Sequence, residues 1–132
     1  MNKIYKKNKV VVWVLIILIV IIGISIFNRA TSSPSELDEF ARCIDDSGAK
    51  FYGAFWCEHC ENQKEAFGKS AKYLPYIECS TPNGQSMNSI CRNENIEGYP
   101  TWEFADGTRE SGELSLELLA ERTSCQLPSL GL

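Results

Sequence analysis

Two cysteines separated by two residues, Cys57 and Cys60, directly follow an apolar run that is rich in aromatic residues. That run, Ala49 to Trp56, is typical of a short strand buried in the centre of a sheet. Residues 61–73 after the pair have helical spacing, and Pro75 marks the end of that segment. The pair therefore stands at a strand-to-helix junction, which places its first sulfur beside the free backbone N–H groups of a helix N-terminus.

This location indicates redox chemistry. Helix N-termini and nearby positive charge favour the thiolate form of a cysteine, and the thiolate is the form that attacks disulfides. We therefore expect Cys57 to be the nucleophile and Cys60 to be the resolving cysteine. His59 lies between them, where a partly protonated imidazole would favour the thiolate of Cys57 further; the alternative is a solvated loop histidine.

Two other interpretations of the pair are less favoured. Half of a zinc site would need two more ligands at suitable spacing, and the chain has one histidine and no second CxxC motif. We therefore predict no metal site. A static disulfide would not need Trp56 before the pair and a helix after it, which together describe an exposed and reactive position.

The remaining segments alternate between helix and strand patterns. A capped helix follows Ser35 and ends near Gly48. A second helix is expected after the turn-rich loop at residues 80–84. The expected elements after the dithiol helix are a strand at 76–79, a helix at 86–94, strands at 101–105 and 108–111, and a helix at 115–123. This order predicts an α/β fold in which helices cover both faces of a central sheet.

The N-terminal region contains an apolar run, residues 10–27, without a charged residue and with only Gly23 and Ser25 as interruptions. A bilayer core of about 30 Å needs about 20 apolar residues as helix, with a lower limit near 17, so we expect one transmembrane signal-anchor helix. A cleaved secretory signal is the alternative. The predicted divisions are a cytoplasmic N-terminus (1–9), the membrane helix (10–27), a linker (28–35), a folded domain (36–127) and a C-terminal tail (128–132).

Charge and cysteine usage agree with export of the folded domain. Lysines precede the apolar run, so the positive-inside rule places the N-terminus in the cytoplasm and the domain outside, in the periplasm or at the cell surface. After residue 29 the chain has 8 basic and 17 acidic residues, a net charge of −9, which argues against nucleic acid or an anionic membrane surface as a ligand. All six cysteines lie beyond the apolar run, and such usage fits an oxidising compartment.

Several motifs occur together in a characteristic order. They are FYGAFWCEHC, ENQKEAFG, LPYIECS, a later Cys91, IEGYPTWEFADG and SGELSLELLAE. As a set they resemble the thioredoxin-like domain that is fused to bacterial vitamin K epoxide reductase homologues. The resemblance extends from about Phe40 to Cys125 and so covers nearly all of the predicted domain.

The resemblance implies a thioredoxin fold, with a central mixed sheet and helices on both faces. It implies that Pro100 is preceded by a cis peptide bond and that the backbone of Tyr99 faces the dithiol and pairs with the substrate chain, with Trp56 beside it. It also implies a structural disulfide between Cys79 and Cys91. Cys43 and Cys125 either pair across the domain or stay free, and their connectivity remains open.

The function expected from these features is that of a membrane-anchored, extracytoplasmic thiol-disulfide oxidoreductase. By resemblance, it would oxidise exported thiol-containing proteins as DsbA does, with no cofactor besides its redox-active disulfide. A separate quinone-linked membrane protein, similar to vitamin K epoxide reductase or DsbB, would regenerate it. Glu58 stands where the family usually has proline, which leaves the direction open. The alternatives are a disulfide reductase, a metal-binding module that uses CEHC, and an inert adaptor.

Overall fold

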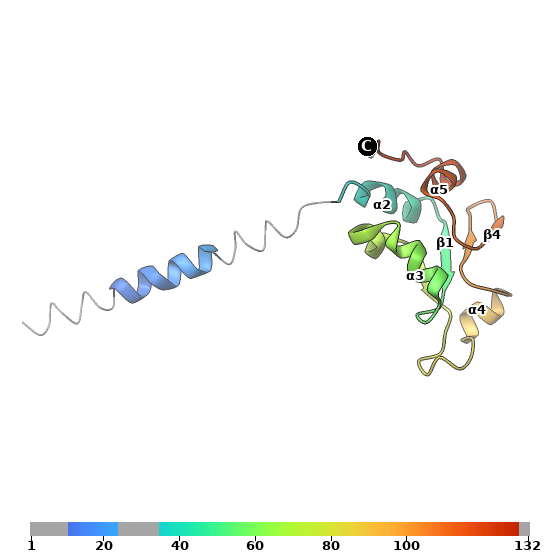
Figure 1. Cartoon of the computed structure of the whole chain (residues 1–132), viewed down its shortest axis with the longest axis horizontal. Coiled ribbons are helices and arrows are strands. Elements are labelled where there is room, and N and C mark those ends of the chain that lie inside the picture. The colour runs from blue at the N-terminus through green and yellow to red at the C-terminus, as the bar shows by residue number, and fades with distance from the viewer. Residues whose placement is uncertain (1–10, 24–34, 130–132) are drawn as a thin grey trace, which may run out of the picture. The chain divides into compact units, whose positions relative to one another are not determined.

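A computed structural model describes residues 11–23 and 35–129 of the chain. These residues belong to two separate units (Figure 1). The first contains an apolar helix over residues 11–23, and the second is a mixed α/β domain that begins at Ser35.

The apolar N-terminal segment requires a correction. Among the described residues, no helix combines the length and the apolar character that crossing a membrane requires. The helix over residues 11–23 is about 20 Å long at about 1.5 Å per residue, whereas a hydrocarbon core measures about 30 Å. This finding contradicts the predicted membrane helix over 10–27 and the single-pass membrane localisation that depended on it. Residue 10 and residues 24–27 lie outside the described residues, as do the predicted N-terminus 1–9, most of the predicted linker 28–35 and residues 130–132 of the predicted tail 128–132.

The domain alternates helices and strands in the predicted order, so the mixed α/β class is confirmed. Its elements are α2 (Asp38–Asp46), β1 (Lys50–Gly53), α3 (Glu58–Glu65), the 3-10 helix η1 (Gly68–Tyr73), β2 (Tyr76–Glu78), α4 (Ser89–Asn93), β3 (Thr101–Glu103), β4 (Arg109–Ser111) and α5 (Leu116–Thr123).

The four strands form one mixed sheet in the order β2-β1-β3-β4. The central strand β1 runs parallel to β2 and antiparallel to β3, and β3 and β4 form a hairpin. Phe51 of β1 is paired with Tyr76 on one side and with Trp102 on the other. The Phe51 ring stacks on Trp102 at 4.6 Å and meets Tyr76 edge-on at 5.2 Å, so aromatic contacts hold the three central strands together.

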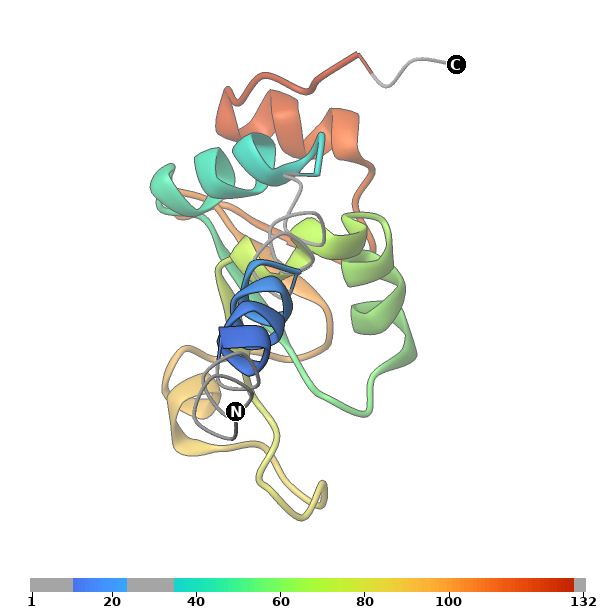
Figure 2. The ribbon, with the colours of Figure 1, turned by 90° about the vertical axis from the view of Figure 1, so that its left-hand side faces the viewer.

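Each face of the sheet has its own buried cluster, because successive residues of a strand point to opposite faces. Phe51 belongs to the larger cluster, which contains side chains of α2, α3 and α5. Tyr52 belongs to the smaller cluster, with Cys79, Cys91 and Ile96. Figure 1 shows α2 and α3 on one side of β1 and α4 on the other, and Figure 2 shows α2 and α5 side by side. Helices therefore cover both faces.

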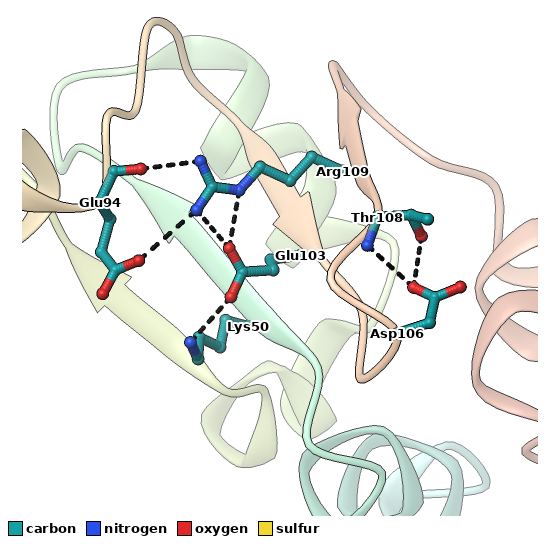
Figure 3. A network of polar contacts seen from close by, with 6 residues as sticks. All are labelled: Lys50, Glu94, Glu103, Asp106, Thr108 and Arg109. Atoms are coloured by element: carbon teal, nitrogen blue, oxygen red, sulfur yellow. Dashed lines mark hydrogen bonds and ion pairs between the residues drawn. The ribbon is translucent and has the colours of Figure 1, made fainter.

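A charged network fixes the sheet near the hairpin (Figure 3). Glu103 on β3 accepts hydrogen bonds from Lys50 Nζ on β1 at 2.8 Å and from Arg109 Nε on β4 at 2.7 Å. Arg109 also donates to the backbone carbonyl of Glu94, just after α4, at 2.7 Å. Lys50, followed by Arg109, holds the pKa of Glu103 below its ordinary value of 4.5. Three strands and the end of α4 are therefore tied to one carboxylate.

Candidate active site

Cys57 occupies the N-cap position of α3, at the end of a tight turn that leaves β1. Its backbone N–H donates to the carbonyl of Ala54 at 2.9 Å, and its backbone is extended, with φ −83° and ψ 112°. Its Sγ accepts a hydrogen bond from the backbone N–H of Cys60 at 3.3 Å. The Cys60 N–H also donates to the Cys57 carbonyl at 3.0 Å, so the sulfur shares this donor at the end of the helix where the dipole favours negative charge.

Cys60 lies one turn further along α3 and is inaccessible. Its exposed fraction is 0%, against 7% for Cys57, and both are free thiols in this structure. Burial, followed by the hydrogen bond with Cys57, raises the pKa of Cys60 to about 12. The Cys60 thiol therefore keeps its proton at neutral pH, and Cys57 is the sulfur that a partner reaches first.

His59 contacts a carboxylate that the sequence analysis did not identify. Its exposed ring places Nδ1 at 2.5 Å from Oε1 of Glu113, and Asn62 Nδ2 donates to the same oxygen at 3.1 Å. The contact with His59 is the main cause that lowers the pKa of Glu113. A positive charge on the imidazole is therefore countered by Glu113, which reduces its expected effect on Cys57. No local sequence signal identifies this pair, because 54 positions separate the two residues.

Two aromatic side chains flank the nucleophile. Phe55 and Trp56 are 52% and 56% exposed, which is unusual for residues next to a buried strand. The Trp56 indole is nevertheless fixed, because Nε1 donates to Ser80 Oγ at 2.9 Å. Gly84 packs beneath both rings, since a Cβ built there would stand 3.4 Å from Phe55 Cζ and 3.6 Å from Trp56 Cδ1. Phe55 was not among the predicted site residues.

Tyr99 and Pro100 lie on the segment that enters β3, and the peptide bond between them is cis. The Tyr99 ring meets Trp56 edge-on at 6.0 Å. Burial is the main cause that raises the pKa of Tyr99, and Glu78, Cys60 and Cys57 add to it. Tyr99 therefore lies close to the dithiol, whereas Pro100 is buried beneath the surface.

The other four cysteines form two disulfides. Cys79 at the end of β2 is bonded to Cys91 of α4, and both residues are fully buried. Cys43 of α2 is bonded to Cys125, which follows α5, across a sequence separation of 82. The dithiol is thus the one reduced pair among the six cysteines, all of which lie within the described residues.

The described residues contain no group of three or more His, Cys, Asp or Glu side chains placed to hold a metal ion. A pair of free thiols one helix turn apart is able to exchange with disulfides. In that reaction Cys57 attacks or is attacked, and Cys60 closes or opens the ring.

The chain is similar to the thiol-disulfide oxidoreductase LTO1 of Arabidopsis thaliana, with 43% identity over 102 residues. The matched region covers 74% of this chain and 27% of that protein, so the chain spans about a quarter of the relative's length. No protein-family model matches the chain. The likeness, taken with the geometry at Cys57 and Cys60, supports a thioredoxin-like redox domain and an oxidoreductase of the thiol-disulfide class.

Proposed function

We propose that this chain oxidises pairs of protein thiols with a Cys57–Cys60 disulfide. The observation that carries the proposal is the N-cap geometry of Cys57, whose sulfur accepts the Cys60 N–H at 3.3 Å while Cys60 is fully buried. The dithiol itself is the redox group, and no bound cofactor is needed.

The reaction proceeds in two exchanges. A substrate thiolate attacks Cys57 Sγ in the disulfide, so that a mixed disulfide forms and Cys60 departs and takes up a proton. A second thiolate of the substrate then attacks the substrate sulfur that is bonded to Cys57. The mixed disulfide breaks, and Cys57 leaves as a thiolate. The substrate loses two electrons and becomes a disulfide, and the enzyme is left as the dithiol.

The direction of electron flow is supported by the environment of Cys57. Its sulfur accepts a hydrogen bond at a helix N-terminus. Such positions favour thiolates in general, and a more stable reduced form makes a disulfide more oxidising. Glu58 at the first helical position acts in the opposite sense, because its negative charge disfavours that thiolate. The two further disulfides are in keeping with an oxidising environment.

The proposed substrates are proteins that present a cysteine on an extended segment. Phe55 and Trp56 offer exposed apolar surface next to Cys57, and the Tyr99 backbone lies just before the start of β3, where an extended chain can pair with it. A separate quinone-linked membrane protein, of the vitamin K epoxide reductase or DsbB type, would then reoxidise the dithiol. This part of the proposal rests on the resemblance of the sequence.

Equilibration of the purified full chain with glutathione redox buffers tests the direction. A reduction potential above about −180 mV supports an oxidant, whereas a value near that of thioredoxin, about −270 mV, or below contradicts it.

Trapping in cells tests the exchange itself. The Cys60→Ala variant should accumulate mixed disulfides at Cys57, and the additional Cys57→Ala change should abolish them. Absence of any trapped partner, together with tight stoichiometric metal on the dithiol, would instead support a metal-binding module.

A further inference from the structure

The buried position of Cys60 creates a proton-transfer problem. When the dithiol closes, the Cys60 thiol must lose its proton before its sulfur attacks Cys57, and when the disulfide opens, the departing sulfur must gain one. Because burial raises the pKa of Cys60 to about 12, water at neutral pH is a poor acceptor for this proton. A group next to Cys60 that accepts and returns the proton would remove the obstacle.

Tyr76 of β2 occupies the space beside the Cys60 sulfur. That space exists because Gly53 has no side chain: a Cβ there would stand 2.6 Å from Tyr76 Cε2 and 3.0 Å from Cys60 Sγ. The edge of the Tyr76 ring and the sulfur therefore converge on the same point. Phe51 packs edge-on against the Tyr76 ring at 5.2 Å and holds it in this position.

The hydroxyl of Tyr76 is joined to a carboxylate. Tyr76 Oη donates to Glu78 Oε2 at 2.8 Å, and the other oxygen, Glu78 Oε1, accepts the backbone N–H groups of Ser80 at 2.7 Å and Phe55 at 3.3 Å. The carboxylate is thus anchored to the loop that carries the dithiol. Burial first, and then the bond to Glu78, raises the pKa of Tyr76, so the hydroxyl keeps its proton and holds this contact.

The other titratable groups around Cys60 are less suited to accept a proton. Cys57 is its partner in the reaction, and Lys64 on α3 is a cation that is paired with Glu61 at 2.9 Å. The Lys64 Nζ lies 3.9 Å from the centre of the Tyr76 ring. Cys60 also contributes to the raised pKa of Tyr99. The hydroxyl of Tyr76, however, is hydrogen-bonded to the carboxylate of Glu78, which can accept the proton from it.

We propose that Tyr76 and Glu78 carry the proton of Cys60. On closure, the Cys60 sulfur comes within hydrogen-bond reach of the Tyr76 hydroxyl and gives it the thiol proton, and the hydroxyl passes its own proton to Glu78. The Cys60 sulfur then bonds to Cys57, and the partner sulfur departs with the electron pair of the broken bond. Glu78 is half-buried and releases the proton to solvent. On opening, the same steps run in reverse. Tyr76 and Glu78 thus serve as acid-base groups for Cys60, and the proposal rests on the proposed thiol-disulfide exchange.

Stopped-flow oxidation of the reduced full chain by 4,4′-dithiodipyridine separates the two chemical steps. Attack by Cys57 releases the first pyridine thione, and closure by Cys60 releases the second. We expect Tyr76→Phe and Glu78→Gln to slow the second release at least tenfold at pH 7 and to leave the first within about twofold, since a positioned acid-base group contributes about 10²- to 10⁴-fold. Raising the pH should restore the second rate as hydroxide replaces the missing acceptor.

The matched control is Tyr73→Phe, which removes the hydroxyl of a tyrosine on η1 that packs beneath Arg42. It should leave both rates unchanged. Glutamine at position 78 keeps an oxygen for the N–H groups of Ser80 and Phe55, so that variant preserves the loop contacts.

Equal second-step rates in wild type, Tyr76→Phe and Glu78→Gln at all pH values would overturn the proton route. Equal slowing of both steps would assign Tyr76 a merely structural role and would also overturn it. Release of a single thione by the wild-type chain would instead contradict the proposed exchange function.

Discussion

Adding one methyl group at Gly53 tests the packing on which the site depends. In Gly53→Ala the new Cβ would stand 2.6 Å from Tyr76 Cε2, a separation that carbon atoms do not tolerate without movement. The ring cannot shift freely, because Phe51 packs against it and Glu78 holds its hydroxyl. The sulfur of Cys60, at 3.0 Å, closes the other side.

The expected magnitude follows from two opposing effects. Overpacking of a well-filled core costs about 1–3 kcal/mol, while replacing glycine by alanine restricts the unfolded chain and returns about 0.4–1 kcal/mol. Taking the middle of each range, the net loss in the free energy of unfolding should be about 1.3 kcal/mol. For a domain of this size, that loss lowers the melting temperature by about 5–10 °C.

Urea denaturation of the full chain, with Cys57 and Cys60 reduced and the two disulfides intact, measures the loss by circular dichroism. The matched control is Gly98→Ala, where a Cβ would meet no heavy atom within 4 Å, so that stability should be unchanged or slightly higher. In a Tyr76→Ala background most of the cost of Gly53→Ala should disappear, because the clashing ring is gone. Gly53→Ala with wild-type stability, or an equal cost in both backgrounds, would refute the packing argument.

Three further predictions concern stability. Replacing both Cys43 and Cys125 by alanine removes a link across 82 positions and should cost about 4.5 kcal/mol by the loop-entropy relation in urea denaturation; a loss below about 1 kcal/mol would contradict that relation here. Gln63→Leu should cost about 2–4 kcal/mol in the same assay, because the buried amide bonds the backbone N–H and C=O of Leu114 at 2.7 and 3.1 Å; near-neutral behaviour would mean that those groups find other partners. The depressed pKa of Glu103 stabilises the fold above the unfolded value and loses this effect as pH falls through the folded value. Glu103→Gln should therefore flatten the decline of unfolding free energy below about pH 5, and an unchanged decline would exclude Glu103 as a cause.

Local patterns predicted the order of the elements but not all of their limits. The helix expected over 61–73 begins earlier, at Glu58, because Cys57 caps it, and it is divided where Gly68 adopts a φ of +52°. The strand expected over 49–56 ends at Gly53, because the Ala54 carbonyl turns to accept the Cys57 N–H. Caps and turns of this kind depend on single hydrogen bonds, which periodicity does not reveal.

The dithiol could be recognised from sequence because its residues are neighbours in the chain and share one helix turn. The partners of the site could not. Glu113 meets His59, and Tyr76 meets Cys60, only after the sheet has brought distant segments together. The same reason left the Cys43–Cys125 bond open, since nothing near either residue indicates the other.

The apolar N-terminal segment shows a different limit. The number of apolar residues over 10–27 indicates how hydrophobic the segment is, but it does not determine how long the helix is. The described helix covers residues 11–23. The expectation of a membrane-crossing helix therefore does not agree with the structure.

The borders of the sheet have a consequence for the proposed oxidation of proteins that are still folding. Polypeptides that still seek their disulfides carry unpaired extended segments, and such segments add readily to any open strand. Here both outer strands are three residues long, and β4 presents Arg109 and Glu110, each engaged in an ion pair. Short, charged borders resist this kind of addition. Under the proposed function, such borders would let the domain release a substrate protein after each exchange instead of aggregating with it.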